Sequence, residues 1–382
     1  MSPRRPPAAF DVDRLLKDPD IKVIVTCGSG GVGKTTTAAA LALRAAEQGR
    51  RVVVLTIDPA RRLAQSLGLV ELDNTPRPVP GIAGGALLAM MLDMKRTFDE
   101  VVLANTTADK AEQIFANPFY QSLSASFAGT QEYMAMEKLS QLRSRLIEHG
   151  DWDLIVVDTP PSRSALDFLD APQRLGRFLD GRMIRLLTAP ARAGGKAYLK
   201  VVGASFSIFS RVLNKILGND LLANVSAFVA SLETMFGGFR ERAEQTYELL
   251  KAPGTAFVVV ASPEPDALRE ASFFVERLQA DAMPLAGVVL NRVRRSEVDL
   301  SADRALDAAD RLAGLDSPGA ELAAAALRVH AETAEAARHD RAMVNRFAAA
   351  HPDVPELQVP ALPTDVHDLA GLRAIGAALA GG

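Results

Sequence analysis

Short apolar runs separated by helical patterns dominate the chain. Residues 21–27, IKVIVTC, form a β-branched run, and an Ala/Leu stretch from Thr35 to Glu47 then predicts a helix, with Gly49 where a C-cap glycine belongs. Later runs are apolar on both faces, which is typical of strands in a parallel sheet that helices cover on both sides. These predicted strands are residues 51–57, 86–92, 154–157, 256–261 and 285–290, and a strand-like segment that begins at Glu356.

Two stretches without convincing strands interrupt this alternation. Residues 94–150 and 164–250 carry helical spacing instead, which predicts a helical subdomain inserted into a sheet domain. A long Ala-rich helix is predicted at residues 321–349. The predicted α/β core therefore comprises residues 1–93, 151–163 and 251–382.

Composition and charge narrow the class of protein. The chain has 382 residues, and its 43 Lys and Arg against 46 Asp and Glu are too even for a strongly basic nucleic-acid-binding surface. The N-terminus lacks the apolar core of a signal peptide, and no apolar run approaches the ~20 residues of a spanning helix. We expect a soluble cytoplasmic protein that neither spans a membrane nor binds nucleic acid.

Cysteine occurs once, at Cys27. One cysteine excludes a disulfide framework and any CxxC zinc or iron–sulfur site made by this chain alone, and it favours a reducing compartment. Because Cys27 ends the first predicted strand, we interpret it as a small buried apolar residue.

A glycine-rich loop between the first predicted strand and helix matches the phosphate-binding pattern G-x-x-x-x-G-K-[ST]. Its glycines let backbone N–H groups point at phosphates, and the following helix adds its positive N-terminal end. We expect Lys34 to reach the β- and γ-phosphates of a nucleotide and the Thr35 hydroxyl to bind Mg²⁺. The predicted phosphate-binding residues are Gly28, Ser29, Gly30, Gly31, Val32, Gly33, Lys34, Thr35 and Thr36.

Two acidic residues fall at strand ends, where ligands bind in open α/β sheets. Asp58 follows the second predicted strand, and Asp158 closes the segment LIVVD. Such carboxylates hold the magnesium shell or polarise the attacking water, so together with Lys34 and Thr35 they predict a hydrolytic site. Asn291 ends a later strand and is a candidate base-reading amide. The guanine signature N-K-x-D is absent there, which favours adenine and predicts ATP and Mg²⁺ as ligands.

These motifs together resemble the ArsA-type family of P-loop ATPases, which includes the arsenite-pump ATPase and the ATPase that targets tail-anchored membrane proteins. The resemblance covers nearly the whole chain. It rests on GSGGVGKTTT, on the switch segments TIDPARR and VVDTPPSR, on VVLN and on the later VPALPTDV. It implies an α/β P-loop NTPase fold with a mainly parallel sheet flanked by helices and a helical insertion, and dimers with nucleotide at the interface.

The resemblance also implies roles for individual residues. Lys34 and Asp58 would serve catalysis, with Asp58 positioning the attacking water. Thr35, Asp58 and Asp158 would hold the metal. The implied switch residues are Asp58, Pro59, Arg61, Asp158, Thr159, Pro160 and Arg163, and the implied adenine contacts are Asn291, Pro360, Leu362, Pro363 and Val366.

One departure from the family's sequence pattern affects which partner subunit we expect. The family's loop normally reads G-K-G-G-x-G-K-T, and its first lysine crosses the dimer interface to the other subunit's nucleotide, whereas this chain has Ser29. A serine cannot supply that charge. We hypothesise a heterodimer with an ArsA-like paralogue that retains the lysine; the competing hypothesis is a homodimer in which Arg61, Arg62 or Arg163 substitutes. Arg61 also replaces the histidine that is common in the family's first switch.

The single cysteine is a second departure. Metalloid-responsive members bind arsenite or antimonite through several cysteines, and the tail-anchored-protein targeting members clamp their dimer with zinc through a CxxC pair. This chain has Cys27 alone. We therefore expect neither arsenite stimulation nor a zinc-clamped dimer.

Two functions from different classes follow. The first is an ATP-hydrolysing dimeric switch that couples nucleotide state to a hydrophobic or membrane-associated client on the helical subdomain. Phe and Met side chains concentrate between Phe168 and Phe239, as either a bundle core or a client groove. The alternative is a weakly hydrolysing regulatory or scaffold subunit. Ser29, which stands in place of the family's lysine, is the residue that supports this alternative. A partitioning ATPase is disfavoured because the C-terminus from Asp365 has one basic residue, Arg373.

Overall fold

The structure is a computed structural model that describes residues 9–58, 62–117, 120–121, 130–160, 244–315 and 317–381. The chain divides into two compact units. The first draws its described residues from 1–91, 150–165 and 251–382, and the second from 92–149 and 166–250.

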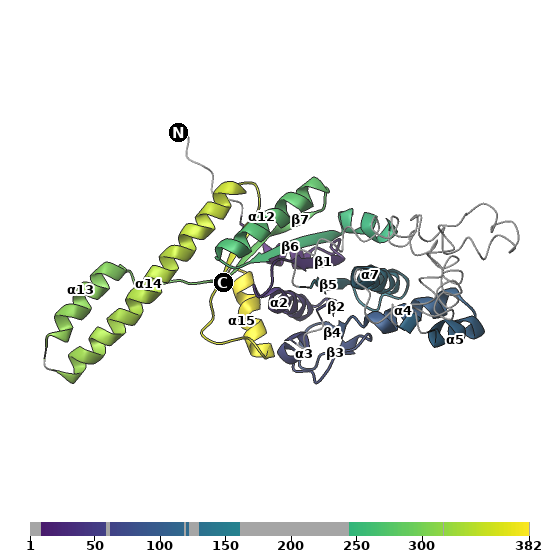
Figure 1. The fold of residues 1–382 in the computed structure, drawn as a ribbon, viewed down its shortest axis with the longest axis horizontal. Helices are drawn as coiled ribbons and strands as arrows, with labels where there is room; N and C mark the ends of the chain where they lie inside the picture. Colours follow the sequence, from purple (N-terminus) through teal and green to yellow (C-terminus); the bar gives the residue numbers. More distant parts are fainter. Residues whose placement is uncertain are drawn as a thin grey trace, which may run out of the picture. The chain divides into compact units, whose positions relative to one another are not determined.

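The first unit is built around one sheet of eight described strands (Figure 1). Their order is β3-β4-β2-β5-β1-β6-β7-β8, and every neighbouring pair is parallel except β3 and β4. The mainly parallel sheet predicted from the apolar runs is therefore confirmed. The strands are β1 (Val23–Cys27), β2 (Arg51–Thr56), β3 (Arg77–Pro78), β4 (Ala86–Met91), β5 (Leu154–Asp158), β6 (Thr255–Ala261), β7 (Leu285–Val293) and β8 (Glu356–Pro360).

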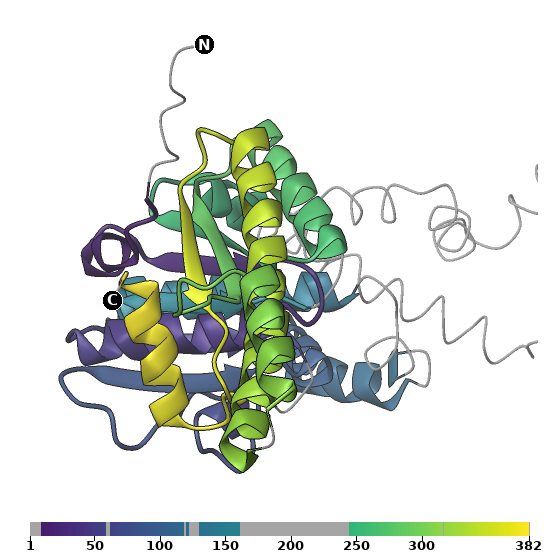
Figure 2. The same ribbon diagram turned by 90° about the vertical axis from the view of Figure 1, so that its left-hand side faces the viewer.

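Helices cover both faces of this sheet (Figure 2). Alternate strand residues such as Ile24, Val156 and Val258 share one core cluster with α1, α2, α3 and α15, because successive side chains of a strand point to opposite faces. On the other face α12 packs against β6 and β7. The helices are α1 (Val12–Lys17), α2 (Lys34–Glu47), α3 (Arg62–Ser66), α12 (Pro265–Ala280), α13 (Ala302–Ala313), α14 (Pro318–Ala350) and α15 (Leu369–Leu379).

The turn after α2 forms at the glycine that the sequence analysis assigned to the helix end. Gly49 has φ +101°, and its N–H donates to the carbonyl oxygen of Ala46 at 2.9 Å, while the Arg50 N–H donates to that of Ala45 at 3.1 Å. This pair of bonds around a left-handed glycine closes the helix end. The predicted C-cap glycine is confirmed, and the chain turns directly into β2.

Strand β7 ends later in the chain than the sequence predicts. β7 continues past the predicted end at Leu290 to Val293, because it pairs Leu290 with Gln358 and then, after a register shift, Val293 with Pro360. Two residues of β7 oppose one residue of β8 at this shift, which is the count of a β-bulge. The bulge lies beside the glycine-rich loop and shapes the site described below.

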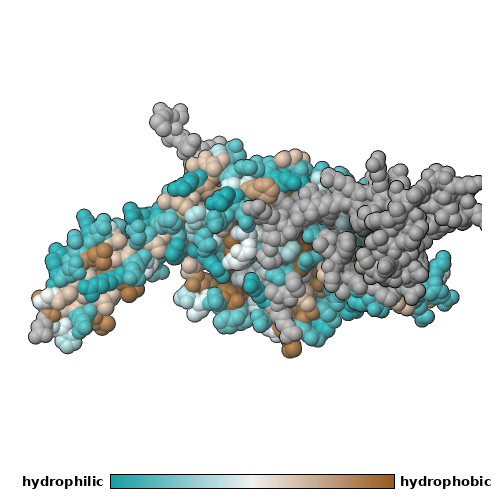
Figure 3. Space-filling model, in the orientation of Figure 1, coloured by the Kyte–Doolittle hydropathy of each residue, from teal (hydrophilic) through white to brown (hydrophobic). Residues whose placement is uncertain are grey.

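Helices α13 and α14 pack together as a hairpin, whose α13 end stands away from the sheet in Figure 1. Figure 3 shows hydrophobic surface, in brown, among the hydrophilic residues of this hairpin. None of the described helices is long and apolar enough to cross a membrane. The large apolar side chains that the hairpin exposes are Leu306, Leu315, Leu322 and Val329.

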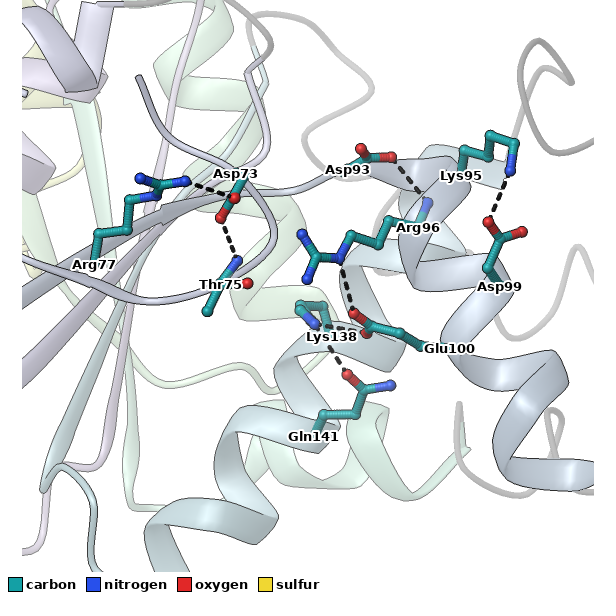
Figure 4. Close-up of polar contacts among 10 residues, drawn as sticks. All are labelled: Asp73, Thr75, Arg77, Asp93, Lys95, Arg96, Asp99, Glu100, Lys138 and Gln141. Atoms are coloured by element: carbon teal, nitrogen blue, oxygen red, sulfur yellow. Dashed lines mark hydrogen bonds and ion pairs between the residues drawn. The ribbon is translucent and has the colours of Figure 1, made fainter. Parts of the chain in front are cut away.

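The second unit is helical in its described part. The buried Nζ of Lys138 on α7 donates to Oε2 of Glu100 on α4 at 2.8 Å (Figure 4), and the ring of Tyr120 meets Phe98 edge-on at 5.4 Å. Residues 168–239, with the predicted concentration of Phe and Met, lie outside the described residues. Among the described residues of this unit lie the helices α4 (Met94–Asn105), α5 (Ala108–Ala116) and α7 (Thr130–Glu148).

Candidate nucleotide-binding site

The glycine-rich loop leaves the sheet in close contact with a neighbouring strand. β1 ends at Cys27, and Gly28 follows with φ +151°. A Cβ atom at Gly28 would lie 2.0 Å from the carbonyl oxygen of Val260 on β6, the parallel neighbour of β1. Any side chain would collide there, so the first glycine of the motif is needed for the loop to pass the sheet.

Helix α2 begins inside the motif and presents its N-terminus to the loop. Gly33 is the N-cap in a left-handed conformation, φ +94°, and no side chain of the described residues caps the helix there. The first N–H groups of a helix lack intrahelical partners and attract anions. This helix start therefore offers N–H donors where a phosphate group is predicted.

Lys34 is held within the loop although it is charged. Its side chain is buried, and its Nζ donates to the carbonyl oxygen of Ser29 at 2.8 Å. Burial lowers the pKa of the Lys34 ammonium, while the negative charges of Asp158 and Asp58 oppose that shift. The lysine therefore places one positive charge beside the helix N-terminus, with a replaceable carbonyl as its partner.

Asp158 sits at the centre of the sheet's carboxyl edge because β5 lies between β1 and β2. One of its oxygens, Oδ2, accepts hydrogen bonds from the hydroxyls of Thr35 at 2.8 Å and Thr56 at 2.9 Å. The other, Oδ1, is buried and has no hydrogen-bond partner in the described part of the chain. Burial raises the pKa of this carboxyl to about 6, although the two hydroxyls and Lys34 act in the opposite direction.

These residues fit a magnesium ion of the kind that accompanies nucleotides. Mg²⁺ is usually held by one or two protein oxygens, waters and phosphates rather than by an all-protein cage. Among the described residues no group of three or more His, Cys, Asp or Glu could hold a metal alone. The Thr35 hydroxyl and the half-buried Asp58 would offer hard oxygen ligands to such an ion, the unsatisfied Oδ1 of Asp158 would accept from a water of its shell, and phosphate oxygens would complete the shell.

A cavity of about 390 Å³ opens at this end of the loop. Lys34, Thr35 and Asp58 line it, as the sequence analysis requires for a phosphate site. Two further cations in its wall, Arg62 and Arg292, come from α3 and β7. The cavity therefore combines one buried and two exposed positive charges with the carboxylates of Asp58 and Asp365, which also line it.

A second cavity of about 410 Å³ adjoins the first. Of the five predicted adenine contacts, Asn291, Pro360, Leu362 and Val366 line it, whereas Pro363 is not among its lining residues. The two cavities form one cleft because they share five lining residues, Gly33, Thr36, Arg292, Asp365 and Val366.

Asn291 has a contact that the sequence analysis missed. It is buried, and its Nδ2 donates to the carbonyl oxygen of Val32 at 2.8 Å, so the amide nitrogen holds the phosphate loop. A Cβ at Gly33 would lie 2.3 Å from that nitrogen, which explains why the loop needs glycine at this point. The cavity-lining residues Arg292 and Arg294 were also missed, although they directly follow the VVLN strand.

The other predicted switch residues fall into two groups. Thr159 is buried and its hydroxyl donates to the carbonyl oxygen of Thr26 at 2.8 Å, which ties the end of β5 to β1, and Pro160 is half-buried. Pro59, Arg61 and Arg163 lie outside the described residues.

Cys27 is buried, as expected for a small apolar residue at the end of β1. Burial raises the pKa of its thiol to about 12, against the opposing charge of Lys34. A thiol with such a pKa stays protonated at neutral pH and is a poor nucleophile or metal ligand.

The chain is similar in sequence to known proteins over most of its length. A family model described as anion-transporting ATPase matches residues 21–306, which span the phosphate loop, both acidic strand ends and Asn291. ATPase get3 of Schizosaccharomyces pombe is 26% identical over 292 residues, 75% of this chain and 78% of that protein. ATPase ARSA2 of Chlamydomonas reinhardtii is 26% identical over 305 residues, 79% of this chain and 75% of that protein. ATPase GET3A of Arabidopsis thaliana is 25% identical over 290 residues, 76% of this chain and 72% of that protein.

Proposed function

This chain belongs to the anion-transporting ATPase family and is, at that level, a nucleotide-binding P-loop ATPase, and we propose that it hydrolyses ATP as a dimeric molecular switch. The observation that carries the proposal is the convergence of Lys34, Thr35 and the buried Asp158 at the start of α2. Metalloid-anion transport is not part of this proposal, because metalloid binding uses several cysteines and this chain has one, Cys27, which is buried.

The phosphate end of the cleft suits the transfer of a phosphoryl group to water. Lys34 exchanges its bond to the Ser29 carbonyl for bonds to phosphate oxygens, which are stronger because both partners are charged. The N–H groups at the start of α2 stabilise the same charge. Asp58 lines this cavity and positions the attacking water.

The metal site is built around one hydroxyl. Mg²⁺ bound to ATP neutralises the charge that develops on the phosphates during transfer. Thr35 lines the phosphate cavity, and because its hydroxyl donates its proton to Asp158 Oδ2, its oxygen would be available as a ligand for the ion. Asp158 is fully buried, so it fixes Thr35 and offers Oδ1 to a water of the metal shell rather than to the ion itself.

The base end of the cleft suits adenine. Pro360, Leu362 and Val366 provide apolar contacts for a purine, and the Oδ1 of Asn291 can accept from the exocyclic amine that adenine carries and guanine lacks at that position. Because the Nδ2 of Asn291 already donates to the Val32 carbonyl, the acceptor side is the one left for the base.

We further propose that this cytoplasmic protein acts as a dimer and binds a hydrophobic or membrane-associated protein client on its second unit. Among the described residues of that unit, Leu103 on α4 and Ile147 on α7 are large apolar side chains exposed to solvent. Ser29 leaves the loop without a second lysine, so the partner is either a lysine-bearing paralogue or a second copy of this chain.

Phosphate release from Mg·ATP by the purified chain, alone and with its lysine-bearing paralogue, tests this proposal. We expect turnover that EDTA abolishes and that Lys34→Ala lowers about 100-fold or more. Lys17→Ala, which removes an exposed lysine of α1, is the matched control and leaves turnover unchanged. Brisk turnover by the chain alone would remove the need for a paralogue, and no turnover with either preparation would contradict the ATPase assignment.

A further inference from the structure

Two successive side chains of β7 reach the same loop, which a regular strand does not allow. Asn291 Nδ2 donates to the Val32 carbonyl at 2.8 Å, and Arg292 Nη1 donates to the Gly31 carbonyl at 3.1 Å. In a regular strand neighbouring side chains point to opposite faces. The bulge between Leu290 and Val293 re-aims one of the two, so that both point at the phosphate loop.

The backbone at Arg292 is in an unfavourable conformation. Its φ is +59°, in the left-handed region that a long side chain seldom adopts. Such conformations persist where the surrounding structure enforces them, and they cluster at ligand sites. A glycine or asparagine would fit this backbone with less strain, so the arginine side chain itself calls for an explanation.

Arg292 stands where the two cavities of the cleft meet. It lines both the phosphate and the base cavity, and its side chain is exposed. Within the described part of the chain its guanidinium makes one hydrogen bond, to the Gly31 carbonyl. A guanidinium carries five N–H donors in a planar fork that matches phosphate oxygens, so most of its donors are left for a ligand in the cleft.

The charge of the cleft also favours such a contact. Lys34 is the one buried cation among the described lining residues of the phosphate cavity, and a Mg²⁺-bound triphosphate keeps net negative charge. A second cation at the loop would balance that charge in a cavity where water is partly excluded. Arg292 is anchored directly to the loop, whereas Arg62, the last residue of the first switch segment, is the first residue of α3.

We propose that Arg292 is a phosphate-binding residue of this chain, whose guanidinium leaves the Gly31 carbonyl to clamp the phosphates of ATP bound in the same subunit. The proposal rests on the proposed nucleotide-binding function. It assigns to the chain's own β7 a positive charge at the phosphates, so that binding of the triphosphate does not depend on a lysine from a partner.

Calorimetric titration of the full chain with Mg·ATP and with AMP tests the proposal, using Arg292→Gln and Arg292→Lys. Arg295→Gln is the matched control, since Arg295 is exposed, donates to one carbonyl, that of Gln358, and lines neither cavity. We expect Arg292→Gln to weaken ATP binding about tenfold or more and AMP binding by less than about twofold. Arg292→Lys should recover part of the loss, because it keeps the charge but not the fork.

Each outcome of these titrations either supports the proposal or contradicts it. Equal weakening of ATP and AMP by Arg292→Gln, or no recovery with Arg292→Lys, would show that the side chain only props up the loop and would overturn the proposal. Unchanged ATP binding would overturn it as well, while leaving the ATPase assignment intact. A wild-type chain that binds no ATP would instead contradict the proposed function, so the two failures are distinguishable.

Discussion

The phosphate end and the base end of the cleft are built in different ways. The predicted chemistry of the phosphate end centres on one continuous loop, residues 28–36, and on Asp58 and Asp158 at the ends of neighbouring strands, although residues 62–66, Arg292 and residues 365–367 also line its cavity. The base end has no such continuous motif: besides Gly33 and Thr36 of the loop, it is lined by residues from 262–264, 291–294 and 360–366 and by Ile375, which lie far apart in the sequence. A motif can specify the first, but tertiary packing has to create the second.

The two ends also differ in electrostatics. At the phosphate end two ionisable groups are buried, so that the pKa of Lys34 is lowered and that of Asp158 is raised, while Arg62 and Arg292 are exposed. The base end combines the apolar Pro360, Leu362 and Val366 with exposed charges such as Arg294. Because charge-assisted hydrogen bonds to phosphate oxygens are stronger than apolar contacts to a base, we expect the phosphates to supply most of the binding free energy.

The largest effect is expected from Gly33→Ala at the phosphate end. The added methyl group would lie 2.3 Å from Asn291 Nδ2 and would also strain a backbone with φ +94°. We expect about 1–3 kcal/mol lower free energy of unfolding and ATP affinity reduced about 100-fold. Urea unfolding and calorimetric titration with ATP measure both effects.

Gly49→Ala is the matched control for Gly33→Ala in the same two measurements. Its φ of +101° is similar, but no described atom lies within 4 Å of the added group. The strain should lower stability by about 1 kcal/mol and leave ATP affinity unchanged. If both variants lost ATP binding alike, the loop geometry would not explain the effect.

Asp158→Asn is expected to raise the stability of the folded protein and to lower its ATPase turnover. Because the folded-state pKa of Asp158 is raised to about 6 from 3.8, the folded state binds more protons than the unfolded state between these values, and stability falls as the pH rises through this window. The variant should therefore be more stable than wild type at pH 7.5 by on the order of 2 kcal/mol, with little advantage below about pH 4.

The measurement for Asp158→Asn is urea unfolding of the nucleotide-free protein in EDTA at both pH values, beside phosphate release. Turnover should fall about 100-fold, since asparagine lacks the negative charge that serves the metal shell. A variant that is less stable than wild type at pH 7.5 would contradict the desolvation argument, and full turnover would contradict the metal role.

A smaller effect is expected at the base end. Leu362→Ala removes apolar contact from a half-buried, open cavity wall and should weaken ATP and AMP equally, by about three- to tenfold. Pro363→Ala is its control, because Pro363 is exposed and is not among the cavity's lining residues. A larger loss in Pro363→Ala than in Leu362→Ala would mean that segment 360–366 binds the base in another arrangement.

The sequence predicted the fold more fully than the cleft. The parallel sheet and the family follow from doubly apolar strands and from the loop motif, and both are confirmed. The loop motif also led to Lys34 and Thr35, which the structure brings beside Asp158, while their catalytic roles stay predictions.

The base end could not be anticipated in the same detail. Alternation along VVLN gives no sign of the bulge that turns both Asn291 and Arg292 toward the loop. The bulge arises from the pairing of β7 with β8, a strand that begins at residue 356, and such long-range register is not encoded locally. Arg294 was missed for a related reason, because α14 orients it: its guanidinium pairs with the buried Asp340.

The smallest effect on stability is expected at Arg292, the residue that lines both ends of the cleft. Arg292→Gly relieves the left-handed strain at φ +59° and should change the free energy of unfolding by no more than about +1 kcal/mol, in the stabilising direction, while ATP binding weakens. Thermal unfolding without nucleotide checks this sign. A marked loss of stability would show that the arginine is retained for the fold rather than for the ligand.

The most direct test of the account is calorimetric titration of the wild-type chain with ATP, ADP, AMP and GTP in the presence of Mg²⁺. We predict that ADP and ATP bind about 100-fold or more tightly than AMP, because the phosphate end supplies most of the affinity, and that ATP binds about tenfold more tightly than GTP. AMP binding as tight as ATP binding, or no nucleotide binding, would contradict the account.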